Sequence, residues 1–513
     1  MKTSEMNLSN ENEQLKQEVA ELRAKLSWYE EQHRLGQLKK YGAKSEASSH
    51  QLSFFDEAEG SASAHEKEPT IEEIKYTRKK RVGKRDEDLA DLPVEELHYE
   101  LNQKERSCPD CAHELHDMGS DVRREIKIIP AKAIVVEHIR HKYACRQCQT
   151  KGMTTPIIKA DAPTPPIPGS LASPSSIAFI MSQKYAEGLP LYRQEKYLNG
   201  LGVNLSRQTM ANWMILSTER HLVKIYEHLK VQLLSQDIIC ADETPVQVLK
   251  EDDRKATTKS TMWLYRSGKT DKPIVLFDYR TTRASKHPKA FLNGFSGFLQ
   301  TDGYVGYRAI PNVTLMGCFA HARRYFHDAV KAGSPKNAGA AQIGLDYCNQ
   351  LFAIERTLSD EQYSSEKRKL YRQEHSQVTL NAFLVWLKTT KPEITPKSLT
   401  AKAITYCLNQ WRYLTAFLHD GRIDISNNQA ERSIKPFVIG RKNWLFSDTQ
   451  KAATASSIIY SLIETAKENG LIPFQYLKFL LEHIPNLKPD DNLDHLMPWH
   501  NSIPDDCFPP TKR

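Results

Sequence analysis

Three acidic residues in this sequence occupy positions from which they can act together on a metal ion. Asp242 ends an apolar, strand-like run at 238–241, Asp302 ends a second such run at 297–301, and Glu431 falls in the first turn of a later predicted helix. Converging carboxylates repel one another and favour divalent cations, and oxygen ligands without thiols suit Mg²⁺ or Mn²⁺. Two such metals about 4 Å apart activate an attacking oxygen and stabilise a leaving one in phosphodiester displacement. The alternative for each acid taken singly is a solvated surface group.

Glu431 heads a segment rich in asparagine, arginine and aromatic residues. Asn427 and Asn428 are predicted to form the N-cap of its helix. Arg441 and Lys442, further along, are predicted phosphate contacts on a basic, aromatic surface. Local helix stability explains the same pattern in another way, because Asn428 and Glu431 have capping-box spacing and a lysine follows Glu431 at i+4.

Four of the nine cysteines form two CxxC pairs, Cys108 with Cys111 and Cys145 with Cys148. Each pair presents two thiolates from one tight turn, and two turns complete a tetrahedral zinc site. The alternative is dithiol redox chemistry. A four-thiolate site leaves no open position on the metal, so we predict structural Zn²⁺ in a zinc ribbon, without a catalytic role.

A pair of helices is predicted after a proline-rich linker, at 192–198 and 206–213, with a glycine turn between them. This pattern is typical of a helix-turn-helix. The second helix carries Arg207, Gln208 and Asn212, which are residue types that contact guanine or adenine edges in the major groove. An ordinary αα-hairpin with a polar face is the alternative.

A basic helix is predicted at 320–330, directly after a strand-like run. We predict that Arg323 and Arg324 contact phosphates; a solvated helix face is the alternative for them, as it is for the basic residues after Glu431. Cys318 and His321 have the types of half a metal site, although a polar start to the helix explains them more simply.

Composition places the chain among proteins that do not span a membrane. Its 513 residues correspond to about three or four domains. Its N-terminus lacks the apolar core of a secretion signal, and no stretch approaches the roughly 18 apolar residues of a membrane span. The expected location is therefore the cytoplasm. The formal net charge of +8 permits nucleic-acid binding without demonstrating it.

Residues 8–33 follow a heptad pattern typical of a short coiled coil. An asparagine at a core position, Asn12, is a known device for fixing a parallel dimer, so we predict a homodimer through this segment. The alternative is an amphipathic helix packed on its own protein. The two core positions are taken by Leu8, Leu15, Leu22 and Tyr29 and by Asn12, Val19, Leu26 and His33.

The predicted fold class is a multidomain α+β protein. Strands are expected at 122–129 and 133–143 in the zinc region, and at 238–242, 262–266, 274–279, 297–302 and 314–318 in a later sheet. The predicted domains are a coiled coil (1–43), a disordered and basic linker (44–90), a zinc-binding ribbon (91–155), a proline-rich linker (156–174), a helix-turn-helix region (175–234), a catalytic core (235–334 and 419–470) split by a helical insertion (335–418), and a C-terminal helix and tail (471–513).

The order of these motifs resembles the DDE transposases of the bacterial insertion-sequence family sixty-six. The resemblance covers nearly the whole chain. It rests on CPDC with YACRQC, SRQTMANW, ADETPVQV, LQTDGYVGY, GCFAHARRYF and ISNNQAERSIKPFVIGRKNWLF.

This resemblance implies an RNase H-like catalytic domain with a helical insertion between the second aspartate and the glutamate. It implies that Asp242, Asp302 and Glu431 form a metal-binding triad, and that the chain cleaves the ends of an insertion sequence and transfers the strands. The expected partners are the terminal repeats, target DNA in the nucleoid and possible small accessory proteins of the same element.

Two rival functions follow from the same residues. Zinc, helix-turn-helix and coiled-coil modules alone would satisfy a non-catalytic DNA-binding regulator whose acids are structural. The metal centre alone would satisfy a plain metal-dependent nuclease, which cuts DNA without joining 3′ ends to a target.

Overall fold

The computed structural model describes individual positions between 15 and 33 and then residues 132–144, 157–332, 339–488 and 490–510. The chain divides into two units, the first comprising Met1–Ala64, Pro163–Glu195 and Ser206–Cys507 and the second His65–Ala162, Lys196–Leu205 and Phe508–Arg513. The described heptad positions, from Leu15 to His33, are helical and exposed. Their pairing with a second chain stays a prediction, and Leu8, Asn12 and the linker at 44–90 lie outside the described residues.

The second unit contains a short antiparallel pair, β1 (Lys142–Ala144) and β2 (Ile157–Lys159). The strand predicted at 133–143 is wrong for 133–141, which has no regular structure. Apolar side chains in that stretch remain exposed, with Val135 at 90%. Strand composition alone does not make a strand, because the backbone also needs a hydrogen-bonding neighbour, and the described one is only three residues long. The strand predicted at 122–129 lies outside the described residues.

The first unit is built on a mixed sheet whose strand order is β5-β4-β3-β6-β7. Its central strand, β3 (Ile238–Lys250), is antiparallel to β4 (Lys259–Ser267), which is antiparallel to β5 (Val275–Arg280). On the other side, β6 (Gly297–Gln300) and β7 (Val313–Met316) run parallel to β3. The five strands predicted for this sheet are therefore present. A short eighth strand, β8 (Ser447–Thr449), pairs with the far end of β3.

The long helix α16 (Gln450–Glu468) covers the free edge of β5. The backbone N–H groups of Val275 and Phe277 donate to the hydroxyls of Thr465 (3.0 Å) and Ser461 (2.7 Å). These hydroxyls replace the ladder partners that an edge strand lacks, so the edge is closed to pairing with another chain.

Helices before the sheet pack with α16 and with α17 (Pro473–His483). They are α5 (Pro174–Tyr185), α7 (Arg207–Ser217) and α8 (Val223–Leu234). Along the chain, α6 (Leu191–Gly200) comes between α5 and α7. The helices predicted at 192–198 and 206–213 are thus present as α6 and α7. Ser206 caps α7 by accepting from the N–H of Thr209 at 3.2 Å. The remaining short helix, α9 (Lys286–Phe291), lies between β5 and β6 in the chain.

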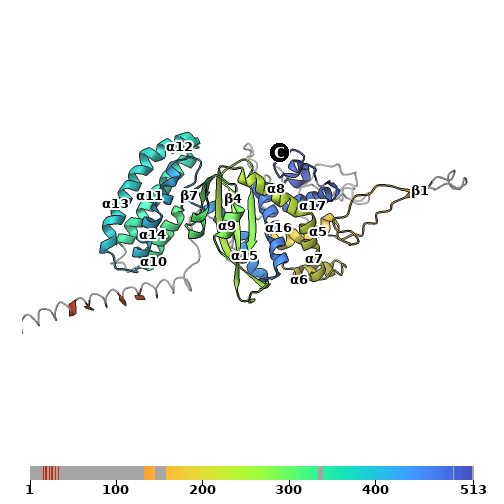
Figure 1. The fold of residues 1–513 in the computed structure, drawn as a ribbon, viewed down its shortest axis with the longest axis horizontal. Helices are drawn as coiled ribbons and strands as arrows, with labels where there is room; N and C mark the ends of the chain where they lie inside the picture. The colour runs from red at the N-terminus through yellow and green to blue at the C-terminus, as the bar shows by residue number, and fades with distance from the viewer. Residues whose placement is uncertain are drawn as a thin grey trace, which may run out of the picture. The chain divides into compact units, whose positions relative to one another are not determined.

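A helical segment separates β7 from the Glu431 helix (Figure 1). It consists of α10 (Phe319–Ala332), α11 (Gly339–Asp360), α12 (Ser365–Tyr371), α13 (Gln377–Thr390) and α14 (Leu399–Leu414). These helices share an apolar core that includes Phe326, Leu351, Phe383 and Cys407. Within the range 335–418, where a helical insertion is predicted, the described residues form α11 to α14 and the short turn after α14.

Arg372 connects this helical segment to the stretch of chain at 417–423, which precedes the Glu431 helix. It is completely buried in a π-helical turn (Arg372–Ser376) after α12. Its guanidinium donates to both carboxylate oxygens of Glu355 at 2.7 Å and to the carbonyls of Phe417, Asp420 and Ile423 at 2.9–3.0 Å. A planar group with five N–H donors suits such a site, where a lysine would leave several acceptors unsatisfied.

Replacing Arg372 with methionine should destabilise the protein by about 3–5 kcal/mol, because it leaves three carbonyls without this donor and leaves the buried Glu355 carboxylate with Arg368 alone, at 3.0 Å. The midpoint of urea unfolding, followed by tryptophan fluorescence, measures this. Lys250→Ala is the control: it removes an exposed ion pair with Asp448 and should change stability by less than about 1 kcal/mol. Equal effects of the two substitutions would contradict the role given to Arg372.

Candidate active site

Asp242 lies on β3, and Asp302 lies two residues beyond the end of its parallel neighbour β6. The last registered pair of β3 and β6 is Cys240 opposite Gln300, and Asp242 and Asp302 each follow it by two residues. The prediction that Asp242 ends its strand is wrong, because β3 continues to Lys250. Antiparallel pairing with β4 supplies hydrogen-bonding partners beyond the point at which the parallel pairing stops.

A tight turn fixes the backbone at Asp302. Its carboxylate accepts a hydrogen bond from the N–H of Tyr304 at 2.9 Å. Gly303 has a φ of +97°, and a Cβ there would lie 3.2 Å from the side chain of Gln410, so only glycine fits without strain. The hydroxyl of Tyr406, on α14, donates to the carbonyl of Asp302 at 3.2 Å. The helical segment thus contributes directly to the position of this acid.

Asn427 brings the start of α15 (Asn428–Trp444), which carries Glu431, to the sheet. Its side-chain amide donates to the carbonyl of Ala241 at 2.9 Å, and its backbone N–H donates to the sulfur of Cys318 at 3.1 Å. The predicted side-chain cap is therefore wrong. Asn427 does stand at the N-cap position, but it makes no side-chain cap bond: its amide nitrogen donates to β3, and its Oδ1, the atom that would accept a cap bond, has no hydrogen-bond partner among the described residues.

The pKa of Asp242 reflects both its burial and the acids near it. Burial raises its pKa to about 7, and the negative charges of Glu243, Asp302 and Glu431 add to that rise. A hydrogen bond of 2.8 Å from the backbone N–H of Glu243 opposes the shift. Two carboxylates contributed by other elements are therefore close enough to disfavour the charge on Asp242.

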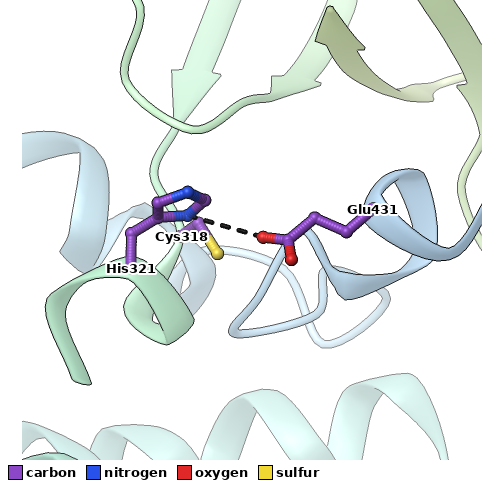
Figure 2. A group of neighbouring side chains, drawn as sticks. All are labelled: Cys318, His321 and Glu431. Atoms are coloured by element: carbon purple, nitrogen blue, oxygen red, sulfur yellow. Dashed lines mark ion pairs between the residues drawn. The ribbon is translucent and has the colours of Figure 1, made fainter. Parts of the chain in front are cut away.

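Glu431 faces α10 through two partners. One carboxylate oxygen, Oε2, accepts from Arg324 at 3.1 Å, and the other, Oε1, lies 3.6 Å from Nδ1 of His321. Figure 2 shows the imidazole and the carboxylate facing each other, with the thiol of Cys318 close to both. Burial lowers the pKa of His321 and raises that of Cys318 to about 11, so both side chains favour their neutral forms.

Sequence reasoning missed Glu243, which directly follows Asp242. Its carboxylate is almost fully covered, accepts from the hydroxyl of Tyr307 at 2.7 Å and is paired with Arg283. Burial raises its pKa, and the charge of Asp302 adds to the rise. The sequence offered one sign of this residue, because it is a second acid that directly follows Asp242 in a predicted strand. Its two partners come from distant segments and have no local signature.

Two of the three acids, Asp242 and Glu431, have surroundings that a divalent cation would satisfy. Oε1 of Glu431 is buried without a hydrogen-bond partner among the described residues, and Asp242 is held where its charge is disfavoured. A cation supplies the missing partner for the first and the missing counter-charge for the second.

Comparison with protein families identifies the chain. The model described as "Transposase IS66 family" matches residues 169–455, which include all three acids and more than half of the sequence. The chain belongs to the IS66 transposase family. Membership supports a transposase role.

Relatives of this IS66 protein occur in Sinorhizobium fredii (strain NBRC 101917 / NGR234). The chain is 32% identical over 416 residues to its protein y4jD, in an alignment that covers 78% of this chain and 79% of the relative. It is 32% identical over 399 residues to y4qI, covering 75% and 71%. A third protein, y4hP, is 29% identical over 408 residues, with the same coverages as y4qI.

Three further family models match other parts of the IS66 protein. The "zinc-finger binding domain of transposase IS66" matches 105–149, the "IS66 C-terminal element" matches 461–499, and the "Transposase C of IS166 homeodomain" matches 28–97. The first supports structural zinc. The last supports DNA binding, and its match overlaps the predicted coiled coil (1–43), the disordered and basic linker (44–90) and the first residues of the predicted zinc ribbon. The predicted zinc ligands Cys108, Cys111, Cys145 and Cys148 lie outside the described residues.

The residues predicted to contact DNA have two kinds of surroundings. On α7, Arg207, Gln208 and Asn212 are exposed, and so is Lys442 at the end of α15. The three remaining arginines contact other protein groups. Arg324 pairs with Glu431, Arg323 donates to Asn349 at 2.8 Å, and Arg441 donates to Thr244 at 2.9 Å.

In the part of the chain that the structure describes, none of the helices combines the length and the apolar character that a membrane-spanning helix needs.

Removing the charge of Asp242 should stabilise the protein near neutral pH when no magnesium is added. The pKa of Asp242 is raised from 3.8 to about 7 in the folded state, so the folded protein keeps a proton that the unfolded chain releases between these values. Stability that depends on this group is therefore lost as the pH rises from about 4 to about 7. Asp242→Asn avoids the loss and should be the more stable protein at about pH 7.5, by on the order of 1–4 kcal/mol, with a smaller margin at about pH 4.5.

Urea unfolding of wild type and Asp242→Asn at the two pH values measures this difference. Asp360→Asn, an exposed acid at the end of α11, should show no pH-dependent gain. A gain for Asp242→Asn that does not grow with pH would contradict the placement of its carboxyl group beside other carboxylates.

Proposed function

We propose that this chain is a DDE-type transposase that cleaves DNA at the ends of an insertion sequence and transfers the strands to target DNA in a reaction that requires Mg²⁺ or Mn²⁺. The proposal rests on the position of Asp302, after β6, and of Glu431, on α15, in a member of a transposase family: the charges of both add to the rise that burial causes in the pKa of Asp242 on β3.

The sheet supports an RNase H-like catalytic core, proposed to comprise 235–334 and 419–470. Three antiparallel strands in sequence order are followed by two strands parallel to the first, which is the arrangement of such a core. The helices at 339–414 fall between Asp302 and Glu431, as expected for an insertion at 335–418. Through Tyr406 and Arg372 this insertion also contacts the backbone at and before the catalytic acids.

In this proposal the three acids hold the metal, and their neighbours set their geometry. Divalent cations bound there would activate the attacking oxygen and stabilise the leaving one. Asp242 gives up its proton when it becomes a ligand, because its raised pKa leaves part of it protonated near neutral pH. Arg324 holds Oε2 of Glu431, and Asn427 holds the start of α15 against β3. Glu243 is proposed to stiffen β3 through Tyr307 and Arg283.

DNA recognition is proposed to use separate modules. The exposed polar residues of α7 would contact bases in the terminal repeats, while a zinc ribbon with Cys108, Cys111, Cys145 and Cys148 as ligands and the basic surface near Lys442 would contact phosphates. Phosphate contacts supply most of the affinity and base contacts the specificity. A homodimer through the N-terminal heptads would bring two ends together, and small proteins of the same element are possible further partners at the nucleoid.

Replacing Asp302 with asparagine should abolish cleavage and joining while leaving DNA binding intact. The substitution removes a metal-binding charge at nearly constant volume, and even changes outside the ligand shell of a metal cost about 10- to 100-fold, so a loss greater than about 100-fold is expected. The assay uses labelled DNA carrying the element's end, purified protein and Mg²⁺ or Mn²⁺, with partner proteins added if wild type is inactive.

Asp360→Asn is the matched control and should cleave like wild type. If Asp302→Asn also cuts like wild type, the proposed triad is wrong. If wild type binds the end but never cuts it, the regulator hypothesis replaces the transposase. If wild type cuts without joining 3′ ends to a target, the nuclease hypothesis does so.

Replacing Arg207 with alanine should weaken binding to the terminal repeat by about 1–3 kcal/mol, and should weaken binding to unrelated DNA much less, because a base contact carries specificity. Lys442→Ala should instead weaken both to similar extents and reduce the salt dependence of binding. Fluorescence anisotropy with the two DNAs at several salt concentrations separates these outcomes. Equal losses on both DNAs for Arg207→Ala would remove α7 from base recognition.

A further inference from the structure

Cys318, His321 and Glu431 form a compact group of three different ligand types beside the proposed magnesium site. One donor atom from each residue lies within 4.8 Å of the others. Cys318 directly precedes α10, His321 lies in the first turn of α10, and Glu431 lies in the first turn of α15. Figure 2 shows the three side chains converging on one point from these two helix starts.

Two donor atoms of this group lack a hydrogen-bond partner in the described chain. Nδ1 of His321 and Oε1 of Glu431 are both buried, and they lie 3.6 Å apart, which is too far for a hydrogen bond. Leaving a buried polar atom unsatisfied costs about 1–3 kcal/mol, so two such atoms facing each other call for a shared partner. A metal ion between them satisfies both at once.

The surroundings of the thiol also suit a metal ligand. The backbone N–H of Asn427 donates to the Cys318 sulfur at 3.1 Å, and donors of this kind hold a ligating thiolate in place. Arg324 pairs with the other carboxylate oxygen, Oε2, which leaves Oε1 available. Asp302 adds a negative charge that acts on His321 and offsets part of the charge of Arg324.

We propose that Cys318, His321 and Glu431 form a second cation site that selects thiophilic divalent metals of the zinc class. Sulfur, imidazole nitrogen and carboxylate oxygen are the ligands that Zn²⁺ accepts, whereas Mg²⁺ takes oxygen ligands. Binding forms a metal–sulfur bond and releases the thiol proton to solvent. The site uses Sγ, Nδ1 and Oε1 and leaves a fourth position for water or an anion.

Glu431 belongs to both the second cation site and the proposed magnesium site, so metal bound at one should affect the other; this expectation rests on the proposed function. A zinc-class ion held by Oε1 withdraws this oxygen from the magnesium site. Micromolar zinc should therefore inhibit magnesium-dependent cleavage, and raising the magnesium concentration should relieve the inhibition.

The binding test uses the full-length protein and Co²⁺, which reports on thiolate ligation through its charge-transfer absorption. Thiolates elsewhere in the chain contribute equally to wild type and variants, so the difference spectrum isolates Cys318. Wild type should bind one equivalent more than Cys318→Ser, and His321→Ala should weaken that equivalent by more than about tenfold. Glu431→Gln is nearly identical in shape and should also weaken binding of the additional cobalt ion. The test therefore does not depend on correct folding of Cys318→Ser alone.

Cys348→Ala is the matched control, since Cys348 is equally buried but lies in the core of the helical segment. It should bind cobalt like wild type. If Cys318→Ser and wild type give the same absorption and the same number of equivalents, the second site is overturned. Inhibition is tested apart from binding, by comparing cleavage by each protein with and without zinc. Cobalt binding in a protein that never cleaves DNA would uphold the site and sink only the proposed function.

Discussion

Asn427 is the residue on which the arrangement of the site depends. Its amide donates to the carbonyl of Ala241 on β3, and its backbone N–H donates to Cys318 at the start of α10. These two bonds join three segments that are far apart in sequence. A side chain that capped its own helix would stabilise α15 locally, whereas this one fixes where α15 begins relative to the sheet. Because Glu431 lies one turn further along α15, the same two bonds set its position relative to the sheet.

Two of the acids, Asp242 and Glu431, lower the stability of the fold that brings them together. Burial and neighbouring carboxylates raise the pKa of Asp242, and Oε1 of Glu431 is buried without a hydrogen-bond partner in the described chain. Such groups cost stability until a cation neutralises them. The rest of the structure offsets this loss of stability. The helix α16 bonds to the edge of β5, Arg372 bonds to carbonyls in the stretch before α15, and the helical segment has an apolar core. Proteins that concentrate charge at one site are expected to have destabilising groups there and fully hydrogen-bonded, well-packed structure around it.

The helical segment between Asp302 and Glu431 is joined to the site by specific bonds. Tyr406 contacts the backbone of Asp302, and Arg372 holds three carbonyls in the stretch that leads to Asn427. A change in the packing of these helices would therefore reach two of the three acids through their backbone. A ligand that binds to this segment could therefore change the geometry of the proposed metal site.

The amino-acid sequence alone determined the strands of the sheet and most helix positions, and it named the three acids of the proposed site, because apolar runs, helical periodicity and family motifs are local signals. It misjudged the end of β3, the role of the Asn427 side chain and the strand at 133–141, and it missed Glu243. Each of these depends on a partner supplied by a distant segment: β4 for β3, Ala241 for Asn427, Tyr307 and Arg283 for Glu243. Cys318 and His321 could be named from the sequence, but only the tertiary structure placed them against Glu431, because α10 and α15 are brought together by contacts that have no pattern along the chain.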